Sequence, residues 1–292
     1  MTDNIPRYGL SNRYLFTGQL IMQTAFHIGG GKATLSNSDS PVVLTPEGAP
    51  FIPGSSFKGA LRSTVEKLVA SLPEELGLWS CGLQDLSESE IEAAQAEKIK
   101  LCPTVRQKEI AQRRRNSQGN DRKIVEEERE KLCTTCKLFG SPFEAAKLSI
   151  NDLYLVENEW SDMIQRRDGV AIDRDSEKAK DRLKYDFEVV PASTTFKLQI
   201  TLENASPHDL QLMSIGLSEF MHGFGFIGGK RSRGLGACLL DGVQVSYLDL
   251  TEDSGNNRSA QLHKYLLRKE FPHDIGGKQF LEEQMKKMFP DA

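Results

Sequence analysis

FGFIGGKRSRGLG, at residues 224–236, combines glycines with three cations and gives the first indication of function. Its glycines permit positive φ angles and let the backbone approach a neighbour or a ligand closely. Lys230, Arg231 and Arg233 belong to the same turn, and glycine N–H groups beside fixed cations suit a phosphate backbone. A P-loop is excluded because the Gly-Lys-Ser/Thr ending is absent, and a dinucleotide-binding turn would lead into a helix instead of a strand. Taken alone, the stretch could equally be a flexible surface loop.

Strand and helix patterns alternate along the rest of the chain. Residues 196–203 alternate apolar and polar side chains, which is typical of a half-buried strand. Residues 56–70 and 208–221 carry apolar side chains at helical spacing, and Ser55 is a potential cap of the first helix. The order strand, helix, strand, strand, helix, strand predicts an α+β, ferredoxin-like sheet. The predicted strands are residues 14–26, 148–156, 196–203 and 237–247.

The amino-acid composition and the distribution of charge limit the classes of protein to which the chain can belong. The chain has 292 residues, of which 38% are hydrophobic and 27% charged, as in an ordinary globular protein. A net charge of −4 argues against a uniformly basic nucleic-acid binder, but acidic residues gather in 83–97 and basic ones in 106–123, so local basic surfaces remain. No stretch approaches the roughly 20 apolar residues of a membrane helix. The start, MTDNIPRYGL, has no apolar signal region, and we expect a cytoplasmic protein.

Two long inserts interrupt the predicted core. The first, residues 80–136, is charged and holds four of the five cysteines. Cys133-Thr-Thr-Cys136 has the two-residue spacing of a tetrahedral metal knuckle, and Cys81 and Cys102 could supply the other two ligands. Scattered reduced thiols are the alternative, whereas the odd number of cysteines disfavours a disulfide framework.

The second insert, residues 158–190, is polar, and its only strong turn signal is Asp168-Gly169. The fifth cysteine, Cys238, lies in the last predicted strand and is expected to be a buried apolar residue. Beyond residue 250 a linker leads to an amphipathic helix. Its apolar side consists of Leu281, Met285, Met288 and Phe289.

IPGSSFKGALR, at residues 52–62, joins a helix start to two cations. Free N–H groups at the start of a helix bind anions well, which makes Ser55 and Ser56 candidate phosphate contacts. Lys58 and Arg62 follow four residues apart on one side of the helix. In isolation this stretch would be read as an ordinary helix cap.

HIGGG at residues 27–31, IPGSSFKGALR and GFIGGKRSRGLG, in this order and spacing, resemble the RAMP superfamily. They look most like the repeating backbone subunit of type III (Csm/Cmr-type) CRISPR effector complexes. The resemblance spans residues 10–248, leaves 249–292 as a C-terminal helical tail, and implies an RRM-like core that packs along a guide crRNA beside neighbouring RAMP subunits and other CRISPR effector subunits. The residues that match the guide-contacting motifs are His27, Ser55, Ser56, Lys58, Arg62, Gly228, Gly229, Lys230, Arg231 and Arg233.

Asp39 is the candidate catalytic residue. A single aspartate beside serine and proline is usually a turn residue. Asp39-Ser40-Pro41-Val42, however, matches the Asp-Ser-Pro-Val sequence of catalytic subunits in this family, which implies metal-dependent cleavage of target RNA. A carboxylate can hold Mg²⁺ or another divalent cation near the scissile phosphate, or help to activate the ribose 2′-OH. We expect the 2′-OH route, which leaves cyclic-phosphate ends.

The resemblance also assigns both inserts. Residues 166–188 are similar to the family's β-hairpin thumb, which wedges between guide and target RNA, although a disordered polar loop is the local alternative. Several family members carry a zinc-binding insert where residues 80–136 lie, which implies structural Zn²⁺ on Cys81, Cys102, Cys133 and Cys136. The thumb's expected RNA contacts include Arg166, Arg167 and Arg174, with Val170 and Ile172 as apolar wedges.

Two other functions stay open at this point. The chain could be a purely structural backbone subunit that binds guide RNA without cutting. It could also be a RAMP endoribonuclease that processes precursor guide RNA, with His27 as general base. His27 lies in the glycine motif shared with backbone subunits, and a thumb is unnecessary for processing, so the cutting backbone subunit is preferred.

Overall fold

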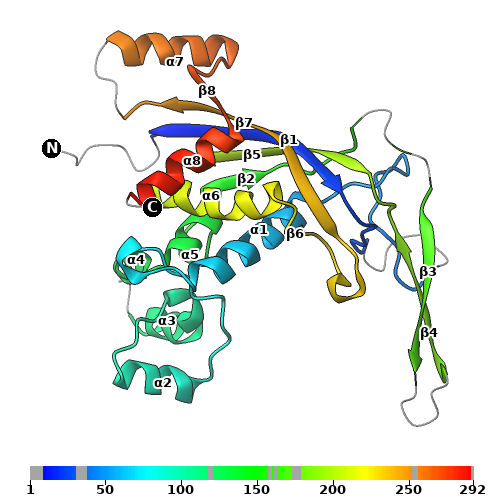
Figure 1. The fold of residues 1–292 in the computed structure, drawn as a ribbon. Helices are drawn as coiled ribbons and strands as arrows, with labels where there is room; N and C mark the ends of the chain where they lie inside the picture. Colours follow the sequence, from blue (N-terminus) through cyan, green and yellow to red (C-terminus); the bar gives the residue numbers. More distant parts are fainter. Residues whose placement is uncertain are drawn as a thin grey trace.

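The computed structural model describes residues 9–30, 38–117, 121–156, 160, 163–172, 179–251 and 256–290. Its centre is a six-stranded sheet in which every strand pair is antiparallel. Four strands follow one another across it in the order β2, β5, β1, β7, and β6 and β8 both pair with the outer edge of β7 (Figure 1). The strands are β1 (Asn12–Met22), β2 (Leu148–Ile150), β5 (Thr195–Glu203), β6 (Gly225–Phe226), β7 (Ala237–Asp249) and β8 (His273–Gly276).

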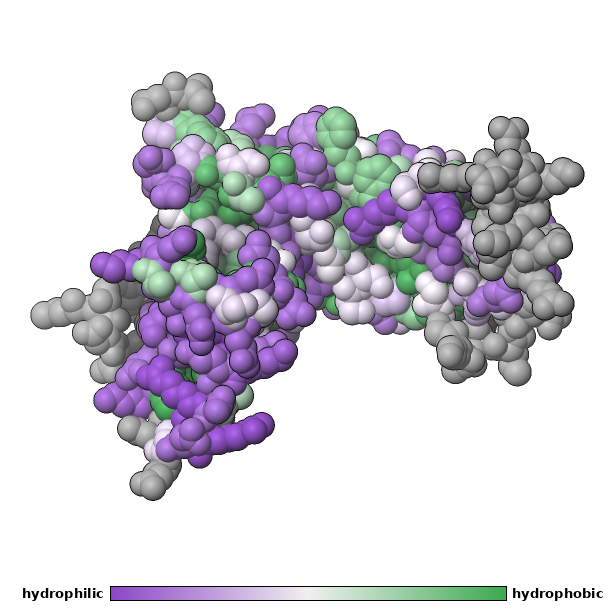
Figure 2. Space-filling model, turned by 90° about the horizontal axis from the view of Figure 1, so that it is seen from below, coloured by the Kyte–Doolittle hydropathy of each residue, from purple (hydrophilic) through white to green (hydrophobic). Residues whose placement is uncertain are grey.

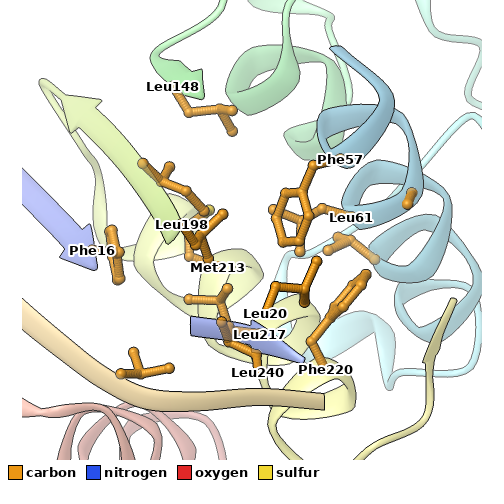
Figure 3. Close-up of a cluster of buried hydrophobic side chains, with 14 of the residues drawn as sticks. Phe16, Leu20, Phe57, Leu61, Leu148, Leu198, Met213, Leu217, Phe220 and Leu240 are labelled. Carbon is orange, nitrogen blue, oxygen red and sulfur yellow. The ribbon is translucent and has the colours of Figure 1, made fainter. Parts of the chain in front are cut away.

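Three helices cover one face of the sheet: α1 (Gly54–Val69), α6 (Pro207–Met221) and α8 (Gly277–Met288). Alternate residues of β1 point to this layer, so that Phe16 and Leu20 are almost fully buried there. Figure 3 shows Phe57 and Leu61 of α1 meeting Phe220 of α6 in the same core. At about 25 cal/mol per Å² of apolar surface, this burial is the main term that stabilises the sheet–helix arrangement. The predicted mixed α and β fold with an antiparallel sheet is confirmed.

The predicted elements agree with the observed ones in kind and differ at their ends. The strand expected to reach residue 26 ends at Met22, because the N–H groups of Gln23 and Thr24 both turn to the carbonyl of Ala237, at 2.9 and 3.3 Å. The strand expected over 148–156 is regular only at β2, after which single bridges continue at Leu153 and Leu155.

Residues 158–190 contain a two-stranded antiparallel hairpin that projects away from the sheet, formed by β3 (Gln165–Ile172) and β4 (Ala179–Val189). The expectation of a turn at Asp168-Gly169 is wrong, because both residues lie inside β3 opposite Asp186 and Tyr185. A Cβ on Gly169 would lie 2.3 Å from Cζ of Tyr185, so the glycine makes room for the ring across the hairpin.

The insert 80–136 forms a small helical lobe beside the helical layer. Figure 2 views the molecule from below Figure 1, and hydrophilic residues cover most of the lobe on its left. The fully buried carboxylate of Glu128 accepts hydrogen bonds from Arg106, Arg113 and Lys131, an arrangement that compensates a charge in the lobe's interior. The segment from residue 74 contains η1 (Glu74–Leu76), α2 (Glu88–Ala96), η2 (Pro103–Arg106), α3 (Gln107–Arg115), α4 (Asp121–Glu130) and α5 (Thr134–Phe139).

The C-terminal segment is part of the main core. It contains α7 (Asn256–Arg268), β8 and α8, and the helix expected around Leu281 and Met288 is confirmed as α8, with both side chains buried against the core. Strand β8 was not predicted, and it pairs with the Gln244–Tyr247 part of β7. None of the described helices combines the length and the apolar character needed to cross a membrane.

Candidate functional site

The HIGGG stretch and the glycine-rich turn, far apart in the sequence, meet in space. The N–H of Gly229 donates to the carbonyl oxygen of His27 at 2.9 Å. Gly228 has φ of 81°, and a Cβ there would lie 2.3 Å from the same carbonyl, so only glycine fits. His27 as a whole residue is 8% exposed, and its Nδ1 lies 2.8 Å from the carbonyl oxygen of Glu188. Two motifs and the base of β4 therefore form one junction.

The cations of the glycine-rich turn lie over aromatic rings at the base of β4. Lys230 Nζ is 4.5 Å from the ring centre of Phe187. The Arg233 guanidinium lies 5.6 Å from the ring centre of Tyr185 and donates to its hydroxyl. Arg231 and Arg233 are exposed and Lys230 is half-buried. Cation–π contacts orient two of the three positive groups while leaving charge accessible to a polyanion.

The start of α1 lies at the same end of the molecule, because α1 contacts β6 and the ring of Phe57 packs 5.1 Å from that of Phe220. Ser55 is exposed, and it is not the cap that the sequence predicts: the helix begins at Gly54, whose N–H donates to Asp152 Oδ1 at 2.8 Å. A carboxylate thus satisfies the first N–H of the helix.

The other candidates on α1 differ in their accessibility. The N–H of Ser56 donates to the carbonyl of Pro53 at 2.8 Å, and the residue is half-buried. Lys58 is half-buried as well, and burial together with the nearby charge of Arg62 lowers the pKa of its amine. A phosphate close to Lys58 would reverse that shift by favouring the charged form.

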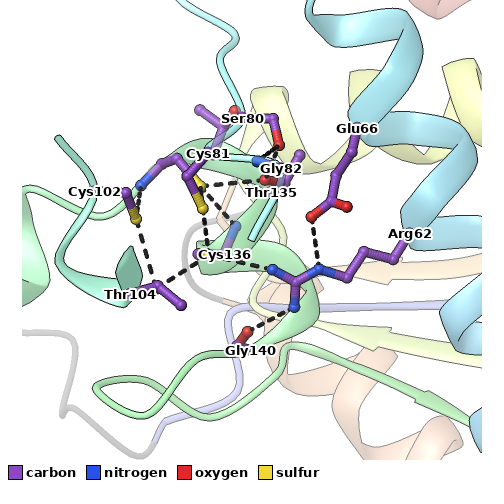
Figure 4. Close-up of polar contacts among 12 residues, drawn as sticks. Arg62, Glu66, Ser80, Cys81, Gly82, Cys102, Thr104, Thr135, Cys136 and Gly140 are labelled. Atoms are coloured by element: carbon purple, nitrogen blue, oxygen red, sulfur yellow. Dashed lines mark hydrogen bonds and ion pairs between the residues drawn. The ribbon is translucent and has the colours of Figure 1, made fainter. Parts of the chain in front are cut away.

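Arg62 makes protein contacts through all three guanidinium nitrogens. Nε donates to Glu66 at 2.8 Å, Nη1 to the carbonyl of Gly140 at 3.1 Å, and Nη2 to Cys136 Sγ at 3.3 Å (Figure 4). These contacts use three of the five N–H donors of the guanidinium and tie Arg62 to the cysteine group described below. The guide-RNA contact expected from the sequence stays a prediction.

Asp39 lies against the base of the hairpin. Its N–H donates to Asp186 Oδ1 at 2.8 Å, and the N–H of Asp186 donates to Asp39 Oδ2 at 3.1 Å. A second clamp follows two residues on: the N–H of Glu188 donates to the carbonyl of Ser40, and the N–H of Val42 donates to Glu188 Oε2, each at 3.0 Å. The side chain of Asp39 is exposed. Residues 185–188 of β4 thus touch the Asp39 loop, His27 and the cation-bearing turn together.

The hairpin arginines have different surroundings. Arg166 forms an ion pair with Asp186, although its side chain is still 60% exposed. Arg167 is exposed. Arg174 lies outside the described residues, and so do the side chains of Val170 and Ile172.

The sulfur atoms of Cys81, Cys102, Cys133 and Cys136 lie within 4.8 Å of one another (Figure 4). The last three residues are buried, and all four cysteines are free thiols. The N–H of Cys136 donates to Cys133 Sγ at 3.3 Å, and the N–H of Cys133 to Cys102 Sγ at 3.4 Å. Hydrogen bonds from the other three sulfurs lower the pKa of Cys102. Four convergent sulfurs with backbone N–H donors fit a tetrahedral structural zinc.

Cys238 stands apart from this group. It is fully buried in β7, as predicted, and burial raises the pKa of its thiol to about 12. In the part of the chain that the structure describes, the four cysteines are the single group of three or more His, Cys, Asp or Glu side chains close enough to share a metal ion.

Sequence reasoning missed the four residues of β4 that organise this site, Tyr185 to Glu188. Their alternation of aromatic and acidic side chains is a strand signal, but the partners of these side chains lie about 150 residues upstream or 50 downstream. Nothing local indicates which loop they hold.

Comparisons with known proteins give the family. The model of the RAMP superfamily matches residues 20–238. A protein named CRISPR system Cms endoribonuclease Csm3, from Methanocaldococcus jannaschii, is 24% identical over 270 residues, which cover 86% of this chain and 87% of that protein. Proteins of the same name from Methanothermobacter thermautotrophicus and Enterococcus italicus are 41% and 44% identical over 56 and 59 residues. These two shorter matches cover 23% and 28% of the respective relatives.

Proposed function

The chain belongs to the RAMP superfamily, and from this premise we propose that it is a guide-RNA-binding backbone subunit of a type III CRISPR effector complex that also cleaves bound target RNA. The names of its relatives as Csm3 endoribonucleases support the proposal. The strand order β2, β5, β1, β7 with helices on one face is that expected of a ferredoxin-like, RRM-like core over residues 10–248. The expected cytoplasmic location stays a prediction.

The observation that carries the proposal is the convergence at the base of β4. One short segment, residues 185–188, holds the cation-bearing turn on one side and the Asp39 loop on the other. Glycine backbone and fixed cations suit the sugar–phosphate chain of a guide crRNA. The carboxylate and the cations therefore lie near enough to act on one nucleic-acid duplex.

Guide contacts are assigned to the accessible members of the three motifs. These are Ser55, Ser56, Lys58, Gly228, Gly229, Lys230, Arg231 and Arg233, with His27 supporting the turn through its carbonyl. The β3–β4 hairpin takes the part of the thumb between guide and target, and its exposed Arg166 and Arg167 supply RNA contacts. Arg174 stays an expected RNA contact. Neighbouring RAMP subunits and other effector subunits complete the surface that binds the guide RNA.

Asp39 supplies the chemistry of target cleavage. Its exposed carboxylate helps to remove the proton from the ribose 2′-OH, whose oxygen attacks the adjacent phosphorus while the 5′-oxygen leaves. The products are a 2′,3′-cyclic phosphate and a 5′-hydroxyl. Mg²⁺ or another divalent cation, when bound, supplies charge stabilisation at the phosphate. The cysteine group holds structural zinc, which joins both ends of the charged insert 80–136.

The test is cleavage of labelled complementary RNA by the assembled complex in the presence of Mg²⁺. Asp39→Ala is expected to abolish target cutting while guide and target binding stay unchanged. Asp85→Ala, which removes an exposed carboxylate in the insert, serves as the matched control and should cut normally. Continued cutting by the Asp39 variant would remove this residue from the mechanism and favour a non-catalytic backbone subunit.

A different substrate, precursor guide RNA, distinguishes the guide-processing alternative from the proposed function. A guide-processing endoribonuclease would cut precursor guide RNA with no target present and would lose that activity in His27→Ala. The buried position of His27, packed behind Glu188, disfavours a direct role in proton transfer from RNA.

A further inference from the structure

Asp186 is the residue to which the Asp39 loop is fastened, and its two oxygens are fully engaged. Oδ1 accepts hydrogen bonds from the N–H of Asp39 and the hydroxyl of Ser38, both at 2.8 Å. Oδ2 accepts from the Arg166 guanidinium. The residue as a whole is 7% exposed. A carboxylate with donors on both oxygens and little solvent contact is poorly placed to act as a base or as a metal ligand.

The contact between the two aspartates is reciprocal, and it leaves the two oxygens of Asp39 unequal. Oδ2 of Asp39 accepts from the N–H of Asp186 at 3.1 Å. Among the described residues, Oδ1 of Asp39 accepts no hydrogen bond, and the side chain is exposed. One oxygen is therefore tied to the strand while the residue stays exposed. This hydrogen bond restricts the rotation of the carboxylate before RNA arrives.

Two neighbouring carboxylates would repel each other without compensation. Arg166 places a cation on the far oxygen of Asp186, and the Ser38 hydroxyl and the Asp39 N–H donate to the near one. The ion pair with Arg166 and these two hydrogen bonds compensate the negative charge of Asp186 within the junction.

We propose that Asp186 is the positioning residue of the RNA-cleaving site: it acts through Asp39, by fixing the loop and the orientation of that carboxylate, and does not touch the RNA itself. The inference rests on the proposed function of Asp39. It also gives Arg166 a role at the cleavage site in addition to the RNA contact expected from sequence.

A merely structural role would look different, and the chain offers a matched comparison two residues along β4. Glu188 also clamps the loop, and the contacts described for it there run to Val42 and Ser40. If Asp186 only tied loop to hairpin, removing the charge at either position should have the same effect. If Asp186 positions Asp39, substitution of Asp186 should lower the cleavage rate more than substitution of Glu188.

The experiment measures the single-turnover cleavage rate at saturating target RNA, and separately the dissociation constant of the target, for the assembled complex. Asp186→Ala is expected to lower the rate about 10- to 100-fold, the usual effect of a misplaced catalytic group, with target binding within about 3-fold of wild type. Asp186→Asn keeps an oxygen for the Asp39 N–H but loses the charge that holds Arg166. Its cleavage rate should therefore lie between those of wild type and Asp186→Ala. Glu188→Gln weakens the clamp on Val42 but leaves both contacts between Asp186 and Asp39 in place, so its loss in rate should be clearly smaller than that of Asp186→Ala.

Three outcomes would overturn the inference: wild-type cutting by Asp186→Ala, an equal loss in rate and in binding, or a matching loss in Glu188→Gln. If Asp186→Ala does not assemble, Asp186→Asn and Ser38→Ala carry the test, because each removes part of the same network. The parent proposal is judged separately by Asp39→Ala. Cutting that persists there rejects the cleavage site itself, whatever the Asp186 variants do.

Discussion

Nη2 of Arg62 lies 3.3 Å from Sγ of Cys136 and donates a hydrogen bond to it, so α1 and the four-cysteine group are directly joined. Burial opposes the charge of Arg62, but hydrogen bonds to Glu66 and the neighbouring Cys136 outweigh it and raise the pKa of the guanidinium. The same helix begins at the candidate RNA surface. Through α1, the contact thus links the four-cysteine group to that surface.

Substitution of Arg62 should act on stability and metal retention. Arg62→Ala leaves the Glu66 carboxylate and the Gly140 carbonyl without a partner, and hydrogen bonds to charged groups are worth about 1.5–3 kcal/mol. We expect a loss of this order in the free energy of unfolding, measured with urea, and faster release of zinc to a colorimetric chelator. Arg62→Lys should recover part of the free energy of unfolding and part of the zinc retention. A loss of guide binding at unchanged stability would instead restore the role expected from sequence.

Metal analysis of the purified protein should find one zinc per chain. Cys133→Ser and Cys136→Ser should each lose it, whereas Cys238→Ala, which removes a thiol outside the group, should keep it. Zinc binds thiolates, so protons compete with it, and retention should fall as the pH is lowered. Chelation should lower the melting temperature of the protein. Full zinc content in either serine variant would contradict the assigned ligand set.

Two glycines of the same turn provide a controlled test of the junction with His27. Gly228→Ala introduces a Cβ about 2.3 Å from the His27 carbonyl and should destabilise the protein by about 1–3 kcal/mol while weakening guide RNA binding. Gly234 has a similar φ of 79°, but a Cβ there meets nothing within 4 Å. Gly234→Ala should therefore show only the smaller cost of a left-handed alanine, about 1–2 kcal/mol at most. Thermal melts and filter binding of guide RNA measure both effects. Equal behaviour of the two variants would mean that close packing against His27 is unimportant.

Local pattern was enough to predict the elements of the core. The alternation in 196–203 and the helical spacing in 208–221 survive in the structure because both segments pack one face against the sheet–helix core, which is the condition those periodicities express. The cysteine group was also predictable, since the two-residue spacing of Cys133 and Cys136 already indicates a shared ligand geometry.

Features set by distant contacts could not be read in this way. Asp168-Gly169 is a strong turn signal locally, yet the glycine is there to accommodate Tyr185 on the facing strand. Arg62 resembles a phosphate ligand when its helix is considered alone. In the structure, its guanidinium donates hydrogen bonds to Cys136 and Gly140, about 75 positions later in the chain. Asp186 gives no sign of its role, because its partner in the Asp39 loop is 147 residues away.

The outer edge of β7 is shared by two short strands, β6 near its start and β8 near its end. A chain shortened after residue 250 would lack β8, so Gln244–Tyr247 would keep their pairing with β1 but have an open outer edge. Open edges of this kind recruit strands from other molecules. By covering this edge, β8 withdraws the backbone of Gln244–Tyr247 from pairing with a strand of another molecule.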